Sequence, residues 1–453
     1  MNHVIALETL ARLRQHKGPP ASTIWVAGYH APGDGGGGMF VLLPADRHSA
    51  DNGGTLIVDA AGRRYGRAGA QAPYDIGWFG ARADGTTDCT PALNSALAAL
   101  PASGGEIVFP PGTYRFDSAI RFILPAGRFS LTLRGAGADV SILFWPQGDG
   151  LQITASSPWH SLHARDLSLT TENAAEHTAI TLLNEAVMSA NTLAMSDFTR
   201  LTFRAQDSSL SYGWGTALRV IGMSNVVYEQ VQAYGVLRSS TAARGKGIDI
   251  SGNPNQPPYY AIVHNLNNCA FFYMGTGLVY GSYLQGVTVS QCNFTQAMTG
   301  IHAPAQRSPS SDSLAQLAVL GGQFNCMQNQ ILIEAALATL LVNASLFYVP
   351  PGYAGIAVQG SQGWLVQTSI VNNSFNCPQP SITGSTGIAI EGTFAAAPSF
   401  AAVVTGNVFY RLDTGVTLGT NTYGWNVQAN SYNQVTTNVL NQGTDNSIGM
   451  ATA

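Results

Sequence analysis

The segment Gly247-Ile248-Asp249-Ile250-Ser251-Gly252 decides the fold, because its pattern returns six times further along the chain. Each copy alternates apolar and variable residues with period two, which indicates a β-strand. Successive copies begin 23 to 32 residues apart, a spacing typical of a solenoid or another repeat architecture. The later copies begin at Gly277, Gly300, Gln330, Gly355, Gly387 and Gly415.

A second pattern lies between these copies and ends in an aromatic residue. A small, thiol or amide residue stands two positions before each aromatic ring. If each repeat is one coil of a parallel β-helix, both positions stack into columns about 4.8 Å apart, where inward amides hydrogen-bond from coil to coil. The aromatic column is Phe271, Phe294, Phe324, Phe347, Phe375, Phe409 and Tyr432, and the column before it is Cys269, Cys292, Gly322, Ser345, Asn373, Asn407 and Asn430.

These two patterns predict an all-β chain built as a right-handed parallel β-helix. A propeller blade needs about 40 residues and four strands, more than these repeats hold. The prediction requires Ile248, Ile301, Ile356 and Ile388 to lie one above another, with the intervening residues facing outward.

Composition limits the classes of partner. Charged residues make up 10% of the 453, against roughly 25% in typical proteins, so we expect a surface of neutral polar residues or one covered by another subunit. The net charge of −4 favours neither nucleic acid nor an anionic membrane as a partner. The five cysteines have no metal-binding spacing and are interpreted as buried thiols.

The N-terminal region is predicted to form a separate small β piece. Val4, Leu7, Leu10 and Leu13 predict an amphipathic helix over 1–17, which is no signal peptide, and no apolar run is long enough to span a membrane. Strands are expected at 23–26, 39–43 and 55–58, with the glycine run 33–38 as a turn rather than a phosphate loop.

A helix is predicted over 91–100, with Thr90 as its N-cap and Pro91 in its first position. A strand follows at 104–109. The run WFGARADGTTDCTPALNSALAAL…GGEIVFPPGTYRF, within 78–116, resembles the opening of pectate-lyase-superfamily β-helix proteins. The resemblance implies that this helix caps the open end of the solenoid.

The preceding run VAGYHAPGDGGGGMFVLL…DNGGTLIV, within 26–58, is similar to the segment before the β-helix in bacteriophage tailspike and depolymerase proteins. This resemblance implies a homotrimeric virion tail protein that acts outside the producing cell on a bacterial surface polysaccharide (O-antigen, capsule or exopolysaccharide). Coil-like sequence continues through 424–432, so a trimer would have to form through the coil faces.

The predicted organisation has four parts. Residues 1–72 form the N-terminal helix and β piece, which attaches to a phage tail or baseplate. Residues 73–116 form the cap helix and first coil, 117–440 the β-helix, and 441–453 a C-terminal tail.

Two groups of outward acids are candidates for glycoside hydrolysis, which needs a pair of carboxyl groups beside a groove. The first and favoured group is Asp207, Glu229 and Asp249 with Arg219, next to the loops that carry Tyr212, Trp214, Tyr259 and Tyr260 as sugar-binding aromatics. The second is Glu334 and Glu391, two coils or about 10 Å apart, with Gln359 between them as a substrate contact.

Other functions remain open on the sequence alone. Any one acid also fits a solvated side chain or a coil-to-coil ion pair such as Asp249 with Arg219. Polysaccharide lyase chemistry would use a base, with His264 and His302 available, and arginine or lysine to neutralise a uronate. A non-catalytic glycan-binding module and a purely structural spike are the further alternatives. No metal or cofactor is predicted, since the run 84–88 lacks the later acidic ligands of a calcium loop.

Overall fold

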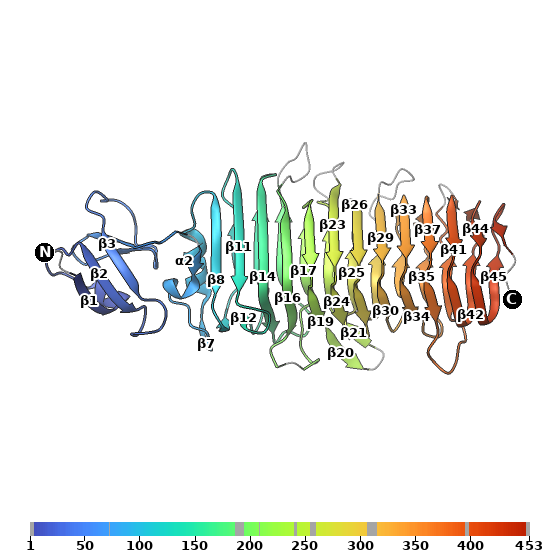
Figure 1. The fold of residues 1–453 in the computed structure, drawn as a ribbon, viewed down its shortest axis with the longest axis horizontal. Coiled ribbons are helices and arrows are strands. Elements are labelled where there is room, and N and C mark those ends of the chain that lie inside the picture. The colour runs from blue at the N-terminus through green and yellow to red at the C-terminus, as the bar shows by residue number, and fades with distance from the viewer. Residues whose placement is uncertain are drawn as a thin grey trace.

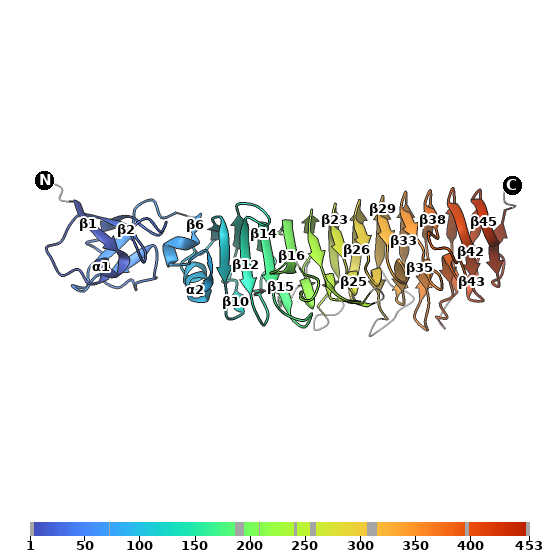
Figure 2. The ribbon, with the colours of Figure 1, turned by 90° about the horizontal axis from the view of Figure 1, so that it is seen from below.

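The computed structural model describes residues 4–71, 73–185, 194–207, 209–239, 242–253, 260–305, 315–394 and 398–449. These residues form a long column with a small sheet at one end, and the two termini lie at opposite ends (Figures 1 and 2). Within the described part of the chain, no helix is long and apolar enough to cross a membrane.

The N-terminal sheet has the strand order β1-β2-β3-β5-β4. Its strands are β1 (Val4–Thr9), β2 (Thr23–Gly28), β3 (Gly38–Leu42), β4 (Leu56–Val58) and β5 (Arg64–Arg67), and helix α1 (Leu10–Arg14) packs Leu10 and Leu13 into its core. The predicted helix over 1–17 is therefore wrong for Val4 and Leu7. Their strand pairs in parallel with β2, and this non-local pairing outweighs the helical spacing. The glycine-rich turn between β2 and β3 is confirmed.

The cap consists of a 3-10 helix, η1 (Ile76–Phe79), and α2 (Thr90–Ala98). Leu93 and Leu97 of α2 are buried in the same apolar core as the coils, as a cap requires. The predicted N-cap is displaced by one residue. Cys89 occupies the N-cap, and the Asp88 carboxylate accepts a hydrogen bond from the backbone N–H of Thr90 at 2.9 Å.

Each coil of the column contributes a strand to three faces of a 35-strand parallel sheet, counted over the described residues. Face 1 contains β10 (Ile120–Ile123), β13 (Leu151–Ala155), β15 (Thr178–Asn184), β17 (Thr216–Ile221), β22 (Lys246–Ser251), β25 (Thr276–Tyr280), β28 (Thr299–Ala303), β31 (Ile331–Ile333), β35 (Ala354–Val358), β39 (Thr386–Ile390) and the second halves of β42 (Val408–Leu418) and β45 (Ser431–Asn441).

Face 2 follows face 1 along the chain in each coil. It contains β6 (Tyr74–Asp75), β8 (Gly104–Phe109), β11 (Phe129–Gly135), the first halves of β14 (His160–Thr171) and β16 (Ser196–Ala205), β18 (Val226–Glu229), β23 (Ala261–Asn267), β26 (Leu284–Ser290), β29 (Gln316–Leu320), β33 (Thr339–Asn343), β37 (Thr368–Val371), β41 (Ala402–Thr405), β44 (Asn426–Gln428) and β46 (Ser447–Ile448). Strand β46 thus lies inside the segment that was predicted as a tail.

Face 3 completes the coil. It contains β7 (Asp84–Asp88), β9 (Gly112–Arg115), β12 (Ser141–Trp145), the second halves of β14 and β16, β19 (Gln232–Tyr234), β24 (Ala270–Phe272), β27 (Asn293–Thr295), β30 (Gln323–Asn325), β34 (Leu346–Tyr348), β38 (Ser374–Asn376) and the first halves of β42 and β45. Three two-stranded pairs decorate the turns: β20 (Val236–Ser239) with β21 (Ala242–Arg244), β32 (Ala336–Leu337) with β36 (Trp364–Leu365), and β40 (Ser399–Phe400) with β43 (Thr422–Tyr423).

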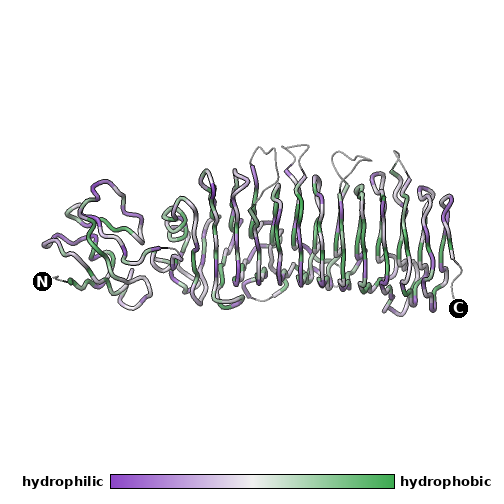
Figure 3. The backbone as a smooth tube through the Cα atoms, turned by 45° about the horizontal axis from the view of Figure 1, so that its top comes forward, coloured by the Kyte–Doolittle hydropathy of each residue, from purple (hydrophilic) through white to green (hydrophobic). Residues whose placement is uncertain are grey.

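The predicted apolar column is confirmed. Ile248 is in register with Leu278 and Ile301, and the column continues through Ile331, Ile356 and Ile388, all without solvent exposure. Apolar colour recurs on the strands of successive coils, with polar colour at many of the turns (Figure 3). Parallel crossovers of this kind are right-handed.

The aromatic and amide columns are confirmed as well. The rings from Phe271 to Tyr432 stack with centroids 4.7–5.1 Å apart. Beside them, Asn373 Nδ2 donates to Asn407 Oδ1, and Asn407 Nδ2 donates to Asn430 Oδ1, both at 3.0 Å. All five cysteines are buried free thiols. The interior is therefore held by stacked rings and by an amide ladder that satisfies buried backbone groups.

Removing one amide of the ladder should destabilise the column. We expect Asn407→Ala to cost about 1–3 kcal/mol for each buried group left without a partner, because Asn407 bonds Asn373, Asn430 and the Ile370 carbonyl. Thermal unfolding measures the loss. Asn433→Ala, at an exposed position of β45, is the control and should stay within about 0.5 kcal/mol of the parent.

His264 of β23 is a core residue, not the base that lyase chemistry would need. It is fully buried, its Nε2–H donates to the Met223 carbonyl at 3.0 Å, and its Nδ1 accepts from the Tyr228 hydroxyl at 3.1 Å. Burial lowers the pKa of His264 to about 4, and the bond to Met223 only partly opposes this shift. The imidazole of His264 is therefore neutral in the folded protein at neutral pH.

This burial predicts a loss of stability in acid. The ordinary pKa of histidine is about 6.5, and that of folded His264 is about 4. Between these two pH values His264 is protonated in the unfolded chain but neutral in the folded chain. The free energy of unfolding therefore falls as the pH drops through this window, by at most about 3 kcal/mol. Melting curves at pH 7 and pH 4.5 should show a smaller acid-induced drop for His264→Gln than for the parent. Equal drops in the two proteins would contradict this assignment.

Candidate functional site

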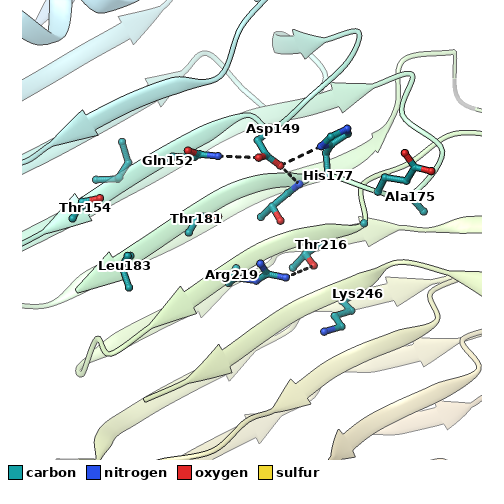
Figure 4. Close-up of a pocket in the computed structure, with 14 residues that line it drawn as sticks. Asp149, Gln152, Thr154, Ala175, His177, Thr181, Leu183, Thr216, Arg219 and Lys246 are labelled. Carbon is teal, nitrogen blue, oxygen red and sulfur yellow. Dashed lines mark hydrogen bonds and ion pairs between the residues drawn. The ribbon is translucent and has the colours of Figure 1, made fainter. Parts of the chain in front are cut away.

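A pocket of about 630 Å³ lies on face 1, across strands β13, β15, β17 and β22 and the turns that precede them. The residues that line it are mostly polar or charged, and they come from four successive coils (Figure 4). Among them are Asp149, Gln152, Glu176, His177, Thr181, Thr216, Arg219 and Lys246.

One end of the pocket is acidic. Asp149 stands on the turn before β13, and its carboxylate accepts hydrogen bonds from the Thr178 backbone N–H at 2.8 Å and from Gln152 Nε2 at 2.9 Å. His177 Nδ1 lies 3.5 Å from Asp149 Oδ1 (Figure 4). Glu176 precedes His177 and is exposed. This end therefore holds a fixed carboxylate, an imidazole and a second carboxyl group.

The other end of the pocket is basic. Lys246 Nζ lies 3.1 Å from Asp249 Oδ2, and Arg219 Nε lies 3.7 Å from the same oxygen. The strand register places Asp149, Thr178, Thr216 and Lys246 in one column, so Asp149 and Lys246 are three coils or about 14 Å apart. A ligand that spans the pocket would meet acids at one end and cations at the other.

The second predicted group forms on the same face. Glu334, Gln359 and Glu391 follow β31, β35 and β39 in register, as expected. Glu334 accepts from Gln359 Nε2 at 3.3 Å and lies 2.9 Å from His302 Nε2. Partial burial alone would raise the pKa of Glu334, but the bonds from His302 and Gln359 outweigh it and lower that pKa. Glu391 is exposed, one coil beyond Gln359.

The first predicted group does not assemble. Asp249 is on face 1, but Glu229 ends β18 on face 2, where it accepts from Asn268 Nδ2 at 3.1 Å. Asp207 is an exposed residue of the loop that leads from face 3 to face 1, and it accepts from the Ser209 backbone N–H. Their separation follows from turn length, which decides the face on which each residue of a coil lies.

The four predicted aromatic sugar contacts do not lie together either. Trp214 is wrong as a sugar contact, because it is 1% exposed and its Nε1–H donates to the Leu169 carbonyl inside the core. Tyr212 is 39% exposed in the loop before β17. Tyr260 is partly exposed, 6.3 Å from the Tyr283 ring, at the opposite edge of face 1. Tyr259 lies outside the described residues.

Comparison with known families places the chain. Residues 76–302, half of the sequence, match the family described as rhamnogalacturonase A/epimerase, pectate lyase-like. The chain belongs to this family. Residues 6–70 match a second family, the phage tail protein small four-stranded beta-sheet domain. A search of curated proteins found no match.

Solved structures share the fold of this pectate lyase-like chain at low identity. Tailspike protein gp49 from Acinetobacter baumannii bacteriophage Fri1, a capsular polysaccharide depolymerase, aligns over 97% of the chain and 75% of its own at 14% identity, with a TM-score of 0.60. The Acinetobacter phage vB_ApiP_P1 tailspike protein aligns over 97% and 71% at 13%, with a TM-score of 0.57.

Tailspike protein 2 from the Escherichia coli O157:H7 bacteriophage CAB120 aligns over 93% of the chain at 15% identity, with a TM-score of 0.54. The pectate lyase-like chain spans about half, 51%, of the length of that tailspike. The resemblance to tailspike β-helices is thus confirmed at the level of the fold, and the residues of the pocket have to be argued from their own geometry.

Sequence reasoning missed Asp149, Glu176 and His177 of this pectate lyase-like chain. Arg219 on this face was recognised, but the three missed residues stand on the turns just before strands β13 and β15. Reading the two residues before each strand would have revealed an acid before β13 and an acid next to an imidazole before β15.

Proposed function

We propose that this chain binds a bacterial surface polysaccharide along face 1 and cleaves it internally by hydrolysis. The observation that carries the proposal is the acidic end of the face 1 pocket, where Asp149 and Glu176 flank a concave site. Pockets with a few convergent polar groups are where small ligands and substrates bind. The tailspike-like fold supports a long glycan as the substrate class.

The two carboxyl groups suit the two roles of glycoside hydrolysis. Asp149 is positioned by hydrogen bonds from the Thr178 N–H and the Gln152 amide, so it can activate water or stabilise positive charge on the sugar. Glu176 is exposed to the ligand and can protonate the departing glycosidic oxygen. His177 Nδ1 lies 3.5 Å from Asp149 Oδ1, on the next coil.

The rest of face 1 supports recognition of the glycan. Arg219 and Lys246, aligned by Asp249, offer two cations for an anionic sugar unit. Four coils or about 19 Å beyond Arg219, the Glu334, Gln359 and Glu391 group offers carboxylate and amide oxygens to sugar hydroxyls. A glycan along the column axis would contact both.

β-Elimination is the second candidate, favoured by one observation. His177 lies in the same pocket as Arg219 and Lys246, which is the combination of a base and cations that a uronate substrate requires. Cleavage of purified host polysaccharide separates the two reactions, because hydrolysis yields reducing ends alone and elimination yields an unsaturated uronate that absorbs ultraviolet light. A protein that binds the glycan and releases neither product would be a binding module.

The acidic end can be tested directly. Asp149→Asn and Glu176→Gln should each lower the cleavage rate by about 100- to 10,000-fold while glycan binding persists, because the lost group transfers a proton or stabilises charge only during the reaction. Release of reducing ends measures the rate. Glu172→Gln, an exposed acid outside the pocket lining, is the matched control and should cleave at the parental rate.

The competing assignment makes the opposite prediction. Glu334→Gln or Glu391→Gln would abolish cleavage, and the two pocket variants would remain active, if the chemistry belonged to the second acid group. That outcome would move the catalytic centre five or more coils along face 1 and would overturn the roles assigned to Asp149 and Glu176.

We also propose a homotrimer attached to a phage tail through residues 1–72. The match of residues 6–70 to a phage tail domain and the low content of charged residues support it, since 10% charge leaves broad uncharged surfaces for subunit contacts. Light scattering at micromolar concentration should give the mass of three chains. A monomer mass would refute the homotrimer but would leave the proposal for the face 1 pocket unaffected.

A further inference from the structure

A second constellation of reactive side chains lies on the outer surface of face 2, away from the pocket. Ser161 and His163 are two residues apart on β14, so both point outward, and β16 places Asp197 directly opposite His163. His163 Nε2 lies 3.1 Å from Ser161 Oγ, and His163 Nδ1 pairs with Asp197 Oδ1. A hydroxyl, an imidazole and a carboxylate thus follow one another in hydrogen-bonded order.

The order of these contacts fixes the imidazole in a reactive form. The Asp197 carboxylate accepts the proton of Nδ1, which leaves the Nε2 lone pair directed at the Ser161 hydroxyl. Burial would raise the pKa of Asp197, but His163, Arg165 and Thr199 together lower it, so the carboxylate is ionised at neutral pH. A nucleophile, a base within reach of it and a group that orients the base define an activated serine.

Two neighbouring features suit a substrate. The Ser161 hydroxyl donates to Ser130 Oγ at 2.9 Å on the adjacent coil. Once the Ser161 proton passes to His163, the Ser130 hydroxyl can turn and donate to an oxyanion formed next to Ser161. In the turn just before β14, Trp159 is 40% exposed, and the Arg128 guanidinium lies 4.1 Å from its ring centroid. An exposed indole beside a nucleophile offers an apolar face to a sugar ring.

We propose that Ser161, His163 and Asp197 form a serine esterase site that removes short O-acyl groups from a glycan bound against face 2. Ser161 is only 5% exposed, so the acyl group has to be small, of the acetyl class. The site is independent of the face 1 pocket, from which it differs in face, in residues and in chemistry.

The reaction balances with water as the only co-substrate. Ser161 Oγ attacks the ester carbonyl carbon while its proton passes to His163 Nε2, and Asp197 stabilises the imidazolium. The tetrahedral intermediate collapses, the C–O bond to the sugar breaks, and His163 returns the proton to the sugar oxygen. Water, deprotonated by His163, then cleaves the acyl-serine and releases a carboxylic acid.

The first experiment uses the intact wild-type protein. A fluorophosphonate probe should label it covalently, and peptide mapping should place the label on Ser161. Hydrolysis of p-nitrophenyl acetate and acetate release from an O-acetylated bacterial polysaccharide measure the activity. No label on Ser161 in a protein that retains its melting temperature would overturn the proposal, whatever the behaviour of any variant.

Variants distinguish a catalytic role of these residues from a purely structural role in the sheet. Ser161→Ala should lose the label and at least about 100-fold of the ester hydrolysis, whereas Ser118→Ala, at an exposed serine elsewhere, should keep the parental rate. Asp197→Asn should lower kcat by about 100-fold or more with KM unchanged, because the amide favours the wrong imidazole tautomer. If the cluster only stabilises the sheet, these variants will lower the melting temperature and leave ester hydrolysis at the parental rate.

The outcome does not depend on the depolymerase proposal. Asp149→Asn, which should stop glycan cleavage, should leave ester hydrolysis and labelling intact, and Ser161→Ala should leave cleavage of a non-acylated glycan intact. Loss of both activities in either variant would contradict two separate sites.

Discussion

The structure depends on the in-register, parallel pairing of each coil with the next. A single coil exposes its apolar side chains and its strand edges, and only stacking at the 4.8 Å strand spacing buries them. Because pairing is in register, every side chain lies above an equivalent one, as Ile356 lies between Ile331 and Ile388. The same rule allows rings to stack and amides such as Asn407 to bond the coils on both sides.

The constraint that builds the core also builds the candidate sites. Outward residues two apart on a strand, or one coil apart on neighbouring strands, are within contact distance. Glu334 meets His302 and Gln359 in this way, and His163 meets Ser161 and Asp197. Ser161, His163, Asp197 and His302 therefore sit on strands, whereas Asp149, Glu176 and His177 stand on the turns just before their strands. Polar networks of this kind cost the solenoid little, because its core lies on the other side of each strand.

The two faces offer different chemistry to one class of polymer. Face 1 presents acids and cations over several coils, which suits the backbone of an anionic glycan, and face 2 presents an activated hydroxyl next to an exposed indole, which suits a substituent on that glycan. Under the two proposals, one polysaccharide whose sugars carry acyl groups is the substrate of both sites. The N-terminal sheet, which matches the phage tail domain, lies at the far end of the column from β45 (Figure 1).

The sequence alone determined the solenoid and its inward columns, because repeat length and period-two alternation are local properties. The cap was implied by the family resemblance of residues 78–116. The columns led by Ile248, Phe271 and Asn373 could be read directly, as could the alignment of Glu334 with Glu391. Only the tertiary structure decided which outward residues meet. Glu229 and Asp249 separated because turn lengths assign each segment to a face. Trp214 turned inward, and Val4–Thr9 became a strand through pairing with β2. Asp149 contacts His177, and Asp197 contacts His163, each on an adjacent coil. Such contacts depend on the register between coils, which only the tertiary structure sets.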